Sequence, residues 1–343
     1  MKSVHKAEGP EVCEGNDITS WTRWRMSSQW AIGSLFAIAV LCFPNSPAQN
    51  NPSDQNDVFA NKAGSATFPF EMSQGEVIVP VSIRGSRPLR FVLDSGSTRT
   101  LIDKTVAASF GLKEGKAGSL QGAGRGPIPI HALQNLDLQM PGLETKHYDC
   151  FTIDLTPVSK SVGTQEDGIL GYSFFARFVV TTDFETKHMT VELPNAFKPP
   201  PNFEELPLEI RGRWAFVKGE LAFSDSVTVQ DSFFIDSGSS DAVDHPIVKK
   251  LKTQTAATSG VGLGTPVEGA LALATFFRIG SFTLKGPIVA CCGATDATNR
   301  MIGTEILRRF TVVFDYPSSR LFLKPNRAFG QSFGTLPPAS GKQ

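Results

Sequence analysis

Two short phrases supply the residues best suited to acid–base chemistry. Each is an apolar, strand-like run that ends in aspartate, serine and glycine. Two carboxyl groups held close together cannot both ionise easily, so one keeps a proton and the pair offers an acid beside a base. One Asp-Ser-Gly is weak evidence because these residues are common in turns, but two copies predict two related lobes that share one site. The phrases are Phe91-Val92-Leu93-Asp94-Ser95-Gly96-Ser97 and Phe233-Phe234-Ile235-Asp236-Ser237-Gly238-Ser239.

Further elements follow each phrase in the same order. An apolar-apolar-glycine signature is followed by an Arg-Phe strand, a turn and a final strand, and the glycine-to-arginine spacing is the same in both halves. The interval from aspartate to glycine is longer in the first half, at 171 − 94 = 77 positions against 303 − 236 = 67. Matched order with unequal loops indicates duplication followed by drift of the loops. The repeated elements are Ile169-Leu170-Gly171 with Arg177-Phe178, and Met301-Ile302-Gly303 with Arg309-Phe310.

Short β-branched and apolar runs with Gly and Pro between them predict an all-β fold. Residues 76–83 and 89–93 read as two strands joined by a turn. The apolar run before each aspartate fits a strand buried on both faces. Short helices are expected at 104–110 and 246–251. The chain has 343 residues and is 41% hydrophobic, which is enough to fill two cores.

Composition argues against several other classes of protein. The net charge is zero and no basic run exceeds two residues, so a nucleic-acid partner is not expected. The five histidines lack metal-ligand spacing, and no Gly-x-Ser-x-Gly phrase offers a serine nucleophile. A glycine-rich string at 260–264 lacks the Lys-Ser/Thr and the helix of a phosphate loop. We expect neither a metal nor a cofactor.

The N-terminal region resembles an export signal. Residues 30–43 are apolar or small, follow Arg23 and Arg25, and are too short for an easy membrane span. Ser46-Pro47-Ala48 fits a cleavage site. We therefore predict a signal peptide at 1–48, with Met26 as a possible true start, and an exported, periplasmic or extracellular protein. The membrane would be contacted only through an uncleaved N-terminal segment.

The remaining chain divides at compositional boundaries. Residues 49–66 are predicted to be a flexible spacer and 197–203 a Pro-rich linker. Three cysteines would remain after cleavage: Cys150, Cys291 and Cys292. They could be unpaired buried residues, which we favour, or form a vicinal bridge or a bridge to Cys150. The predicted lobes are 67–196 and 204–326, with a tail at 327–343.

With these motifs in both halves, residues 67–325 resemble a two-lobed aspartic peptidase of the pepsin and retropepsin superfamily, of bacterial type. The resemblance implies two related β-barrels of the six-stranded type with an active-site cleft between them. It implies that Asp94 and Asp236 are the catalytic pair. Ser95 and Ser237 would tie the two aspartate loops together, and the glycines would allow carboxylate and backbone to approach. The remaining positions carried over are Gly96, Gly238, Ser97 and Ser239, the two serines as hydroxyls that bond a carboxylate oxygen.

The resemblance also implies flaps over the site. Pepsin-like enzymes carry a flap tyrosine, but the candidate flap at 120–128 has none. A second Gly-rich candidate at 259–265 makes the plan closer to the symmetric retropepsins. Arg99 departs from the usual apolar residue and could lower an aspartate pKa or bind an acidic substrate group, although a solvated side chain is favoured. The flap and substrate-binding candidates are Gly122, Gly124, Arg125, Gly262 and Gly264.

The leading hypothesis is an exported aspartic endopeptidase that acts on peptide or protein substrates as a monomer. Water activated between Asp94 and Asp236 would attack the peptide carbonyl. The alternative is a peptidase-like module that binds a peptide or other ligand without catalysis, because fold does not guarantee function. A third interpretation makes both Asp-Ser-Gly phrases structural turns. Intact phrases in both halves favour the enzyme.

Overall fold

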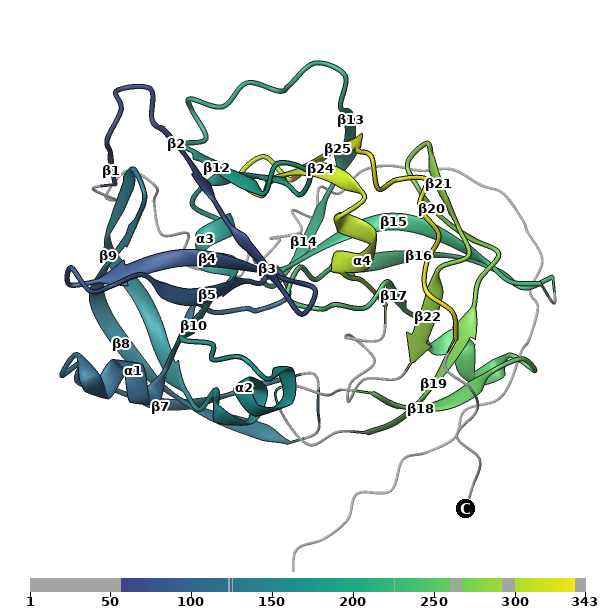
Figure 1. The fold of residues 1–343 in the computed structure, drawn as a ribbon, viewed down its shortest axis with the longest axis horizontal. Coiled ribbons are helices and arrows are strands. Elements are labelled where there is room, and N and C mark those ends of the chain that lie inside the picture. The colour runs from purple at the N-terminus through teal and green to yellow at the C-terminus, as the bar shows by residue number, and fades with distance from the viewer. Residues whose placement is uncertain are drawn as a thin grey trace, which may run out of the picture. The chain divides into compact units, whose positions relative to one another are not determined.

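The structure is a computed structural model that describes residues 57–122, 124, 126–224, 226–259, 263, 267–291 and 300–336. The predicted signal peptide and residues 49–56 of the predicted spacer lie outside the described residues. The described part belongs to one compact unit. It is built almost wholly of strands (Figure 1), as the sequence pattern predicted.

The first lobe is a sheet in which the strand order is β1-β9-β6-β10-β5-β4-β8-β7, with β3 beside β4. Strand β8 also pairs with β9, so the ladder from β9 through β5 and β4 to β8 returns on itself. These strands are β1 (Val58–Phe59), β3 (Glu71–Ser73), β4 (Glu76–Ile83), β5 (Leu89–Leu93), β6 (Leu101–Asp103), β7 (Ala117–Gln121), β8 (Pro127–Met140), β9 (Leu143–Ile153) and β10 (Gly168–Leu170).

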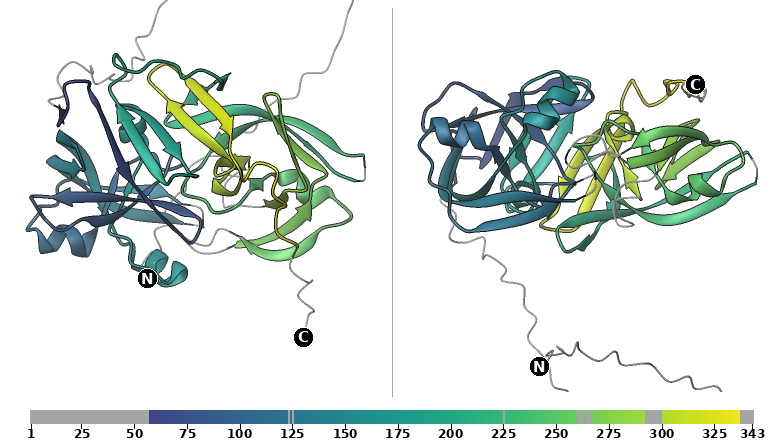
Figure 2. Two further views of the ribbon diagram at one scale, coloured as in Figure 1. Left: turned by 45° about the horizontal axis from the view of Figure 1, so that its top comes forward. Right: turned by 90° about the horizontal axis from the view of Figure 1, so that it is seen from below.

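The second lobe has the order β18-β19-β22-β17-β23-β16-β15-β20-β21, with β14 beside β15. The pairings between described residues leave this sheet open, so closed barrels stay a prediction. Figure 2 shows the strands of the two halves of the chain as two groups. The strands are β14 (Glu209–Arg211), β15 (Trp214–Ala222), β16 (Thr228–Ile235), β17 (Val243–Asp244), β18 (Thr255–Ser259), β19 (Val267–Leu273), β20 (Phe276–Ile279), β21 (Phe282–Lys285), β22 (Ile288–Cys291) and β23 (Met301–Ile302).

A six-stranded antiparallel sheet takes three strands from each half of the chain, in the order β13-β25-β24-β11-β12-β2. At its centre β11 pairs with β24, the equivalent strand of the repeat, with Thr181 opposite Val313. The two Arg-Phe strands of the sequence repeat thus meet each other. The members are β2 (Ser65–Pro69), β11 (Val179–Asp183), β12 (His188–Glu192), β13 (Glu204–Pro207), β24 (Phe310–Asp315) and β25 (Arg320–Pro325).

Both lobes repeat the same parallel strand pairing at the aspartate phrases. The strand before Asp94, β5, runs parallel to β10, and the strand before Asp236, β16, runs parallel to β23. The predicted short helices follow as α1 (Lys104–Ser109) and the 3₁₀ helix η2 (Pro246–Lys250). Asp103 caps α1 with its carboxylate, and His245 caps η2 through Nδ1. Three further helices are α2 (Thr156–Val162), α3 (Tyr172–Phe175) and α4 (Thr304–Leu307).

The equivalent arginines of the repeat hold the two ends of the described chain. Arg177 binds the Asp57 carboxylate, with Nε 2.7 Å from Oδ2. Because Asp57 is anchored and strands β1 and β2 begin at 58 and 65, residues 57–66 are not the flexible spacer that composition predicted. Arg309 is 1% exposed and donates to the carbonyl of Ala328 at 3.2 Å. Residues 328–332 are therefore held beside Arg309 of the second lobe.

Candidate active site

The two aspartates occupy equivalent places at the ends of β5 and β16. The Asp94 backbone N–H donates to the Leu170 carbonyl at 2.9 Å, and the Asp236 N–H donates to the Ile302 carbonyl at 3.0 Å. Each aspartate is therefore held by the apolar-apolar-glycine signature of its own lobe. The order of motifs seen in the sequence has a direct geometric cause.

Serine hydroxyls join the two aspartate loops across the lobes. The Ser95 N–H donates to Ser237 Oγ at 3.0 Å, and the Ser237 N–H donates to Ser95 Oγ at 2.9 Å. Each hydroxyl then donates to the opposite strand, Ser95 to the Ile235 carbonyl at 2.8 Å and Ser237 to the Leu93 carbonyl at 2.7 Å. Both serines are buried. Their positions agree with the linking role that the resemblance implied.

The glycines of the two phrases let each loop approach the opposite carboxyl group. A Cβ atom placed on Gly96 would lie 2.5 Å from Asp236 Cγ, and one on Gly238 would lie 2.4 Å from Asp94 Cγ. Both distances are far inside van der Waals contact. Glycine is required at these positions because the opposite carboxyl group leaves no room for a side chain.

The carboxyl groups of Asp94 and Asp236 interact with each other, and each lies against the glycine of the opposite loop. Asp94 Oδ1 also accepts from the N–H groups of Gly96 and Ser97, at 2.8 and 2.9 Å. Burial raises the pKa of both groups, and the neighbouring Asp94 charge raises the pKa of Asp236 further, well above its usual range. Backbone donors favour the charged form. Asp94 Oδ1 accepts two backbone bonds while Asp236 Oδ1 accepts one, from the Gly238 N–H at 3.0 Å, so Asp94 is the better base of the pair.

The outer serines differ from the expectation. The Ser97 hydroxyl donates to the Arg99 carbonyl at 2.8 Å, while its backbone N–H contacts the carboxylate. Ser239 Oγ accepts from the Asp241 N–H at 3.2 Å. The expected hydroxyl-to-carboxylate bonds are therefore wrong in this structure, because both hydroxyls instead bond to the backbone of the turn that follows.

An apolar row leads to each aspartate on the same face of its sheet. Side chains alternate between faces along a strand, so the residue two before each aspartate shares its face. Val92 is in register with Ile78 on β4 and Ile169 on β10. The second lobe repeats the row around Phe234, and its cluster consists of Phe216, Phe234, Met301 and Trp214. The row is aliphatic in the first lobe and largely aromatic in the second.

Next to each apolar row, on the same face, the residue opposite the aspartate is of a different type in each lobe. Extending the β4–β5 register by two residues brings Glu76 opposite Asp94. The Glu76 carboxyl bonds to that of Glu166, and burial together with the Glu166 charge raises the pKa of Glu76 to about 8. In the second lobe the same position is Trp214, whose Nε1–H donates to the Gly96 carbonyl at 2.8 Å.

Sequence reasoning did not select Glu76, Glu166 or Trp214. Glu76 opens a β-branched run and Glu166 directly precedes the Asp167-Gly168-Ile169-Leu170-Gly171 motif. Their sequence positions next to repeated elements were a usable signal. None of the three residues belongs to a motif of the family, so motifs alone do not identify them.

The two predicted flaps are hairpin tips that touch. Strands β7 and β8 form one hairpin and β18 and β19 form the other. The Gly124 N–H donates to the Leu263 carbonyl at 2.8 Å. Leu263 also packs against an apolar cluster of the first lobe, beside Leu120 and Ile128. Arg125, Gly262 and Gly264 lie outside the described residues.

Gly122 is placed directly under the other flap. A Cβ atom at Gly122 would lie 2.3 Å from the Leu263 carbonyl oxygen and 2.8 Å from Ile128 Cδ1. The close approach of the two hairpins thus depends on the missing side chain. At Gly122, close packing of the two hairpins explains why the residue is glycine.

Arg99 does not act on the aspartates. Its guanidinium lies over the Phe151 ring, 5.3 Å from the centroid, and burial lowers its pKa. The main causes of the Asp94 pKa shift are burial, Asp236 and the backbone N–H groups of Ser97 and Gly96. Of the cysteines, Cys150 is free and buried, whereas Cys291 is disulfide-bonded. The favoured unpaired state is thus wrong for Cys291, the bridge to Cys150 is excluded, and Cys292 lies outside the described residues.

The described residues contain no group of three or more His, Cys, Asp or Glu side chains arranged to hold a metal ion. In the same part of the chain, no helix has the length and apolar character needed to span a membrane.

Comparison with known proteins agrees with this geometry. Residues 79–174 match the family model described as aspartyl protease. The fold is similar to the crystal structure of aspartic proteinase from Irpex lacteus, with a TM-score of 0.51 and 13% identity over 78% of this chain and 99% of that chain. A search of curated proteins found no match.

The fold is therefore that of the two-lobed, all-β aspartic proteinases. The family match covers residues 79–174, which lie in the first lobe, and the likeness to the solved structure shows the fold. Both comparisons leave the bacterial type a prediction.

Proposed function

We propose that this protein is an aspartic endopeptidase that hydrolyses peptide bonds with water activated between Asp94 and Asp236. The observation that carries the proposal is the pair of half-buried carboxyl groups that two equivalent loops bring together. Reciprocal serine bonds hold these loops at a fixed separation. Fixed geometry of this kind is what general acid–base catalysis requires.

The two carboxyl groups divide the proton transfers between them. Asp94 removes a proton from the water, whose oxygen attacks the peptide carbonyl carbon, while Asp236 gives its proton to the carbonyl oxygen. The resulting intermediate carries two hydroxyl groups on the former carbonyl carbon. Asp94 then protonates the leaving nitrogen and Asp236 takes a hydroxyl proton back, which breaks the C–N bond and restores both groups. All atoms come from the peptide, the water and the dyad.

The same assignment gives a pH dependence with two limits. At low pH Asp94 becomes protonated and the base is lost. At high pH Asp236 loses its proton and the acid is lost. Because the pKa of Asp236 lies well above its usual range, the upper limit lies far above that of an ordinary carboxylic acid.

Several features support the other parts of the proposal. Both aspartates come from one chain, so we propose a functional monomer. The touching flaps support a substrate strand held beneath them, as an endopeptidase needs, with closure excluding water. Export rests on the apolar segment at 30–43 and the cleavage-like Ser46-Pro47-Ala48.

The decisive experiment is cleavage of a peptide library by the wild type, by Asp94→Asn and by Asp236→Asn, with folding checked by circular dichroism. Products from the wild type alone would support the proposal. Cleavage by a folded single variant at the wild-type rate would refute it. N-terminal sequencing of exported protein should find Gln49 first, and a cytoplasmic full-length form as the only species would refute export.

A further inference from the structure

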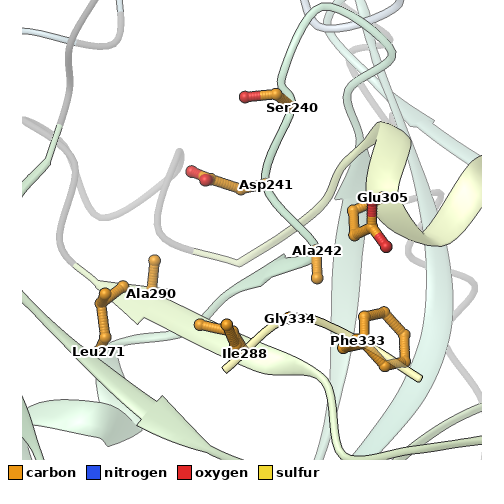
Figure 3. A pocket seen from close by; sticks show the side chains of 9 residues that line it. All are labelled: Ser240, Asp241, Ala242, Leu271, Ile288, Ala290, Glu305, Phe333 and Gly334. Atoms are coloured by element: carbon orange, nitrogen blue, oxygen red, sulfur yellow. The ribbon is translucent and has the colours of Figure 1, made fainter. Parts of the chain in front are cut away.

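A pocket of about 260 Å³ lies in the second lobe, just beyond the Asp236 phrase. Figure 3 shows Ser240 and Asp241 on the loop that leads down to Ala242, with the opposite wall built from strands β19 and β22. The wall side chains are mostly apolar. The lining residues are Ser240, Asp241, Ala242, Leu271, Ile288, Ala290, Glu305, Phe333 and Gly334.

The loop that forms one wall of the pocket also contacts the first lobe. Ser240 follows the Asp236 phrase directly, and a Cβ atom on Gly75 of the first lobe would lie 2.7 Å from Ser240 Cβ. Gly75 precedes Glu76, the residue in register with Asp94. The Ser240 wall of the pocket is therefore packed against the first lobe close to the candidate dyad.

Within the described part of the chain, one carboxylate of the pocket has no counter-charge. Among described residues none donates a hydrogen bond or ion pair to the Asp241 side chain, which is exposed. Glu305 also lines the pocket, but it is neutralised by Arg308 at 2.6 Å and by Arg309 at 2.8 Å. Asp241 is thus the carboxylate that remains available to a ligand.

A second acidic group, Asp244, interacts electrostatically with Asp241. Asp244 is 6% exposed, and its Oδ1 has no hydrogen-bond partner. Burial and the Asp241 charge raise the pKa of Asp244 well above its usual range. Buried acids normally have partners. A cation bound at Asp241 would favour the charged form of both acids.

We propose that this pocket binds the side chain of a lysine or arginine of the substrate, with Asp241 as the residue that selects it. The inference rests on the proposed peptidase function and specifies its substrate class. The volume lies just below the range of small-molecule sites, about 300–1,000 Å³, which suits one side chain. Leu271 and Ile288 are half-buried and can contact the methylene stem, while the cationic end reaches Asp241.

The test uses peptides that differ only at one position, scanned through the sites on both sides of the scissile bond. That position carries lysine, arginine, norleucine or glutamate. At the position that enters the pocket, wild type should prefer lysine and arginine to norleucine. Asp241→Asn should lower kcat/KM for those two peptides by roughly 10- to 100-fold, with little change for norleucine. Asp241→Lys should shift the preference to glutamate.

The matched control is Glu209→Gln, which removes an exposed acid of the same lobe outside the pocket. It should leave the preference unchanged. Equal rates for lysine and norleucine in the wild type, or a lysine preference that persists in Asp241→Asn, would overturn the inference while the peptidase function stands.

A binding measurement separates this inference from the proposed function. If the wild type cleaves no peptide, the proposed function fails. The pocket is then judged by fluorescence binding to Asp94→Asn protein. The lysine peptide should bind about tenfold more tightly than the norleucine peptide, and the added Asp241→Asn change should abolish the difference. Equal binding of the two peptides overturns the inference.

Discussion

The walls that flank the two aspartates share a backbone plan but differ in chemistry. In the first lobe an aliphatic row around Val92 ends at Glu76, and in the second an aromatic row around Phe234 ends at Trp214. Glu76 bonds to another carboxyl group, whereas Trp214 donates to the opposite aspartate loop. The two lobes have equivalent backbones where the two carboxyl groups must meet. Their side chains differ along the walls, where a substrate peptide would lie. A peptide has two different ends, so the two walls would contact different parts of it.

The residues after the two aspartate phrases also combine an equivalent backbone with different side chains. The Arg99 and Asp241 carbonyl groups occupy equivalent places, since a Cβ atom on Gly171 would lie 2.1 Å from the first and one on Gly303 would lie 2.3 Å from the second. Their side chains carry opposite charges. Packing against Gly171 and Gly303 constrains the backbone of Arg99 and Asp241 and not their side chains. The charge at these two positions can therefore differ between the lobes.

The largest expected effect tests the equivalence of the two lobes at the dyad. Asp94→Asn and Asp236→Asn should each lower kcat by about 10⁴-fold or more, because neither carboxyl can supply both acid and base. The double variant should be no worse than either single variant, because the pair acts as a unit. Single-turnover cleavage of a peptide measures this. Multiplicative losses in the double variant would show that the groups act separately.

The next effect tests the equivalence of the serine bonds. Ser95→Ala and Ser237→Ala should each lower the free energy of unfolding by about 2–3 kcal/mol, because each leaves buried backbone groups without partners. The two losses should match, and the double variant should lose less than their sum. Urea unfolding measures this, with Ser119→Ala on exposed β7 as the control. A loss confined to one lobe would break the equivalence.

A pH experiment tests the difference between Glu76 and Trp214. The pKa of Glu76 is about 8 when folded against 4.5 as a free group. The folded state holds this proton more tightly, so its stabilisation is complete below about pH 4.5 and is lost as the pH rises through about 8. Glu76→Gln cannot ionise and should lose roughly 2 kcal/mol less than wild type over this interval.

The measurement is urea unfolding of wild type, Glu76→Gln and Trp214→Phe between pH 4.5 and 8.5. Trp214→Phe should follow the wild-type pH dependence, because indole does not titrate in this range. Parallel curves for wild type and Glu76→Gln would show that the Glu76–Glu166 pair does not retain a proton.

The smallest expected effect concerns the flaps. Gly122→Ala places a methyl group against the Leu263 carbonyl and should lower kcat/KM about tenfold by keeping the hairpins apart. The melting temperature should change by no more than about 2 °C. Gly118→Ala on the same hairpin is the control, since its Cβ would meet Ile130 at an ordinary 3.7 Å. Full activity together with a large loss of stability would make Gly122 a packing residue only.

The sequence alone was sufficient for the repeated parts of the site. The aspartate phrases, the glycine signatures, the strands and the hairpin positions all follow from short, local patterns. What it missed depends on register and on contacts across lobes, as with Glu76 opposite Asp94 and Trp214 on the Gly96 carbonyl. The serine hydroxyls at 97 and 239 were misassigned because a family role was transferred without the local turn geometry.

The pairing of β11 with β24 gives the chain the character of a tethered dimer. Two copies of one strand meet antiparallel, as in a self-complementary twofold interface. The 197–203 connection makes their association intramolecular, so the two halves meet at a high effective concentration that does not depend on how much protein is present. An enzyme with one catalytic group per subunit would lose activity on dilution. This chain keeps both groups together at any concentration.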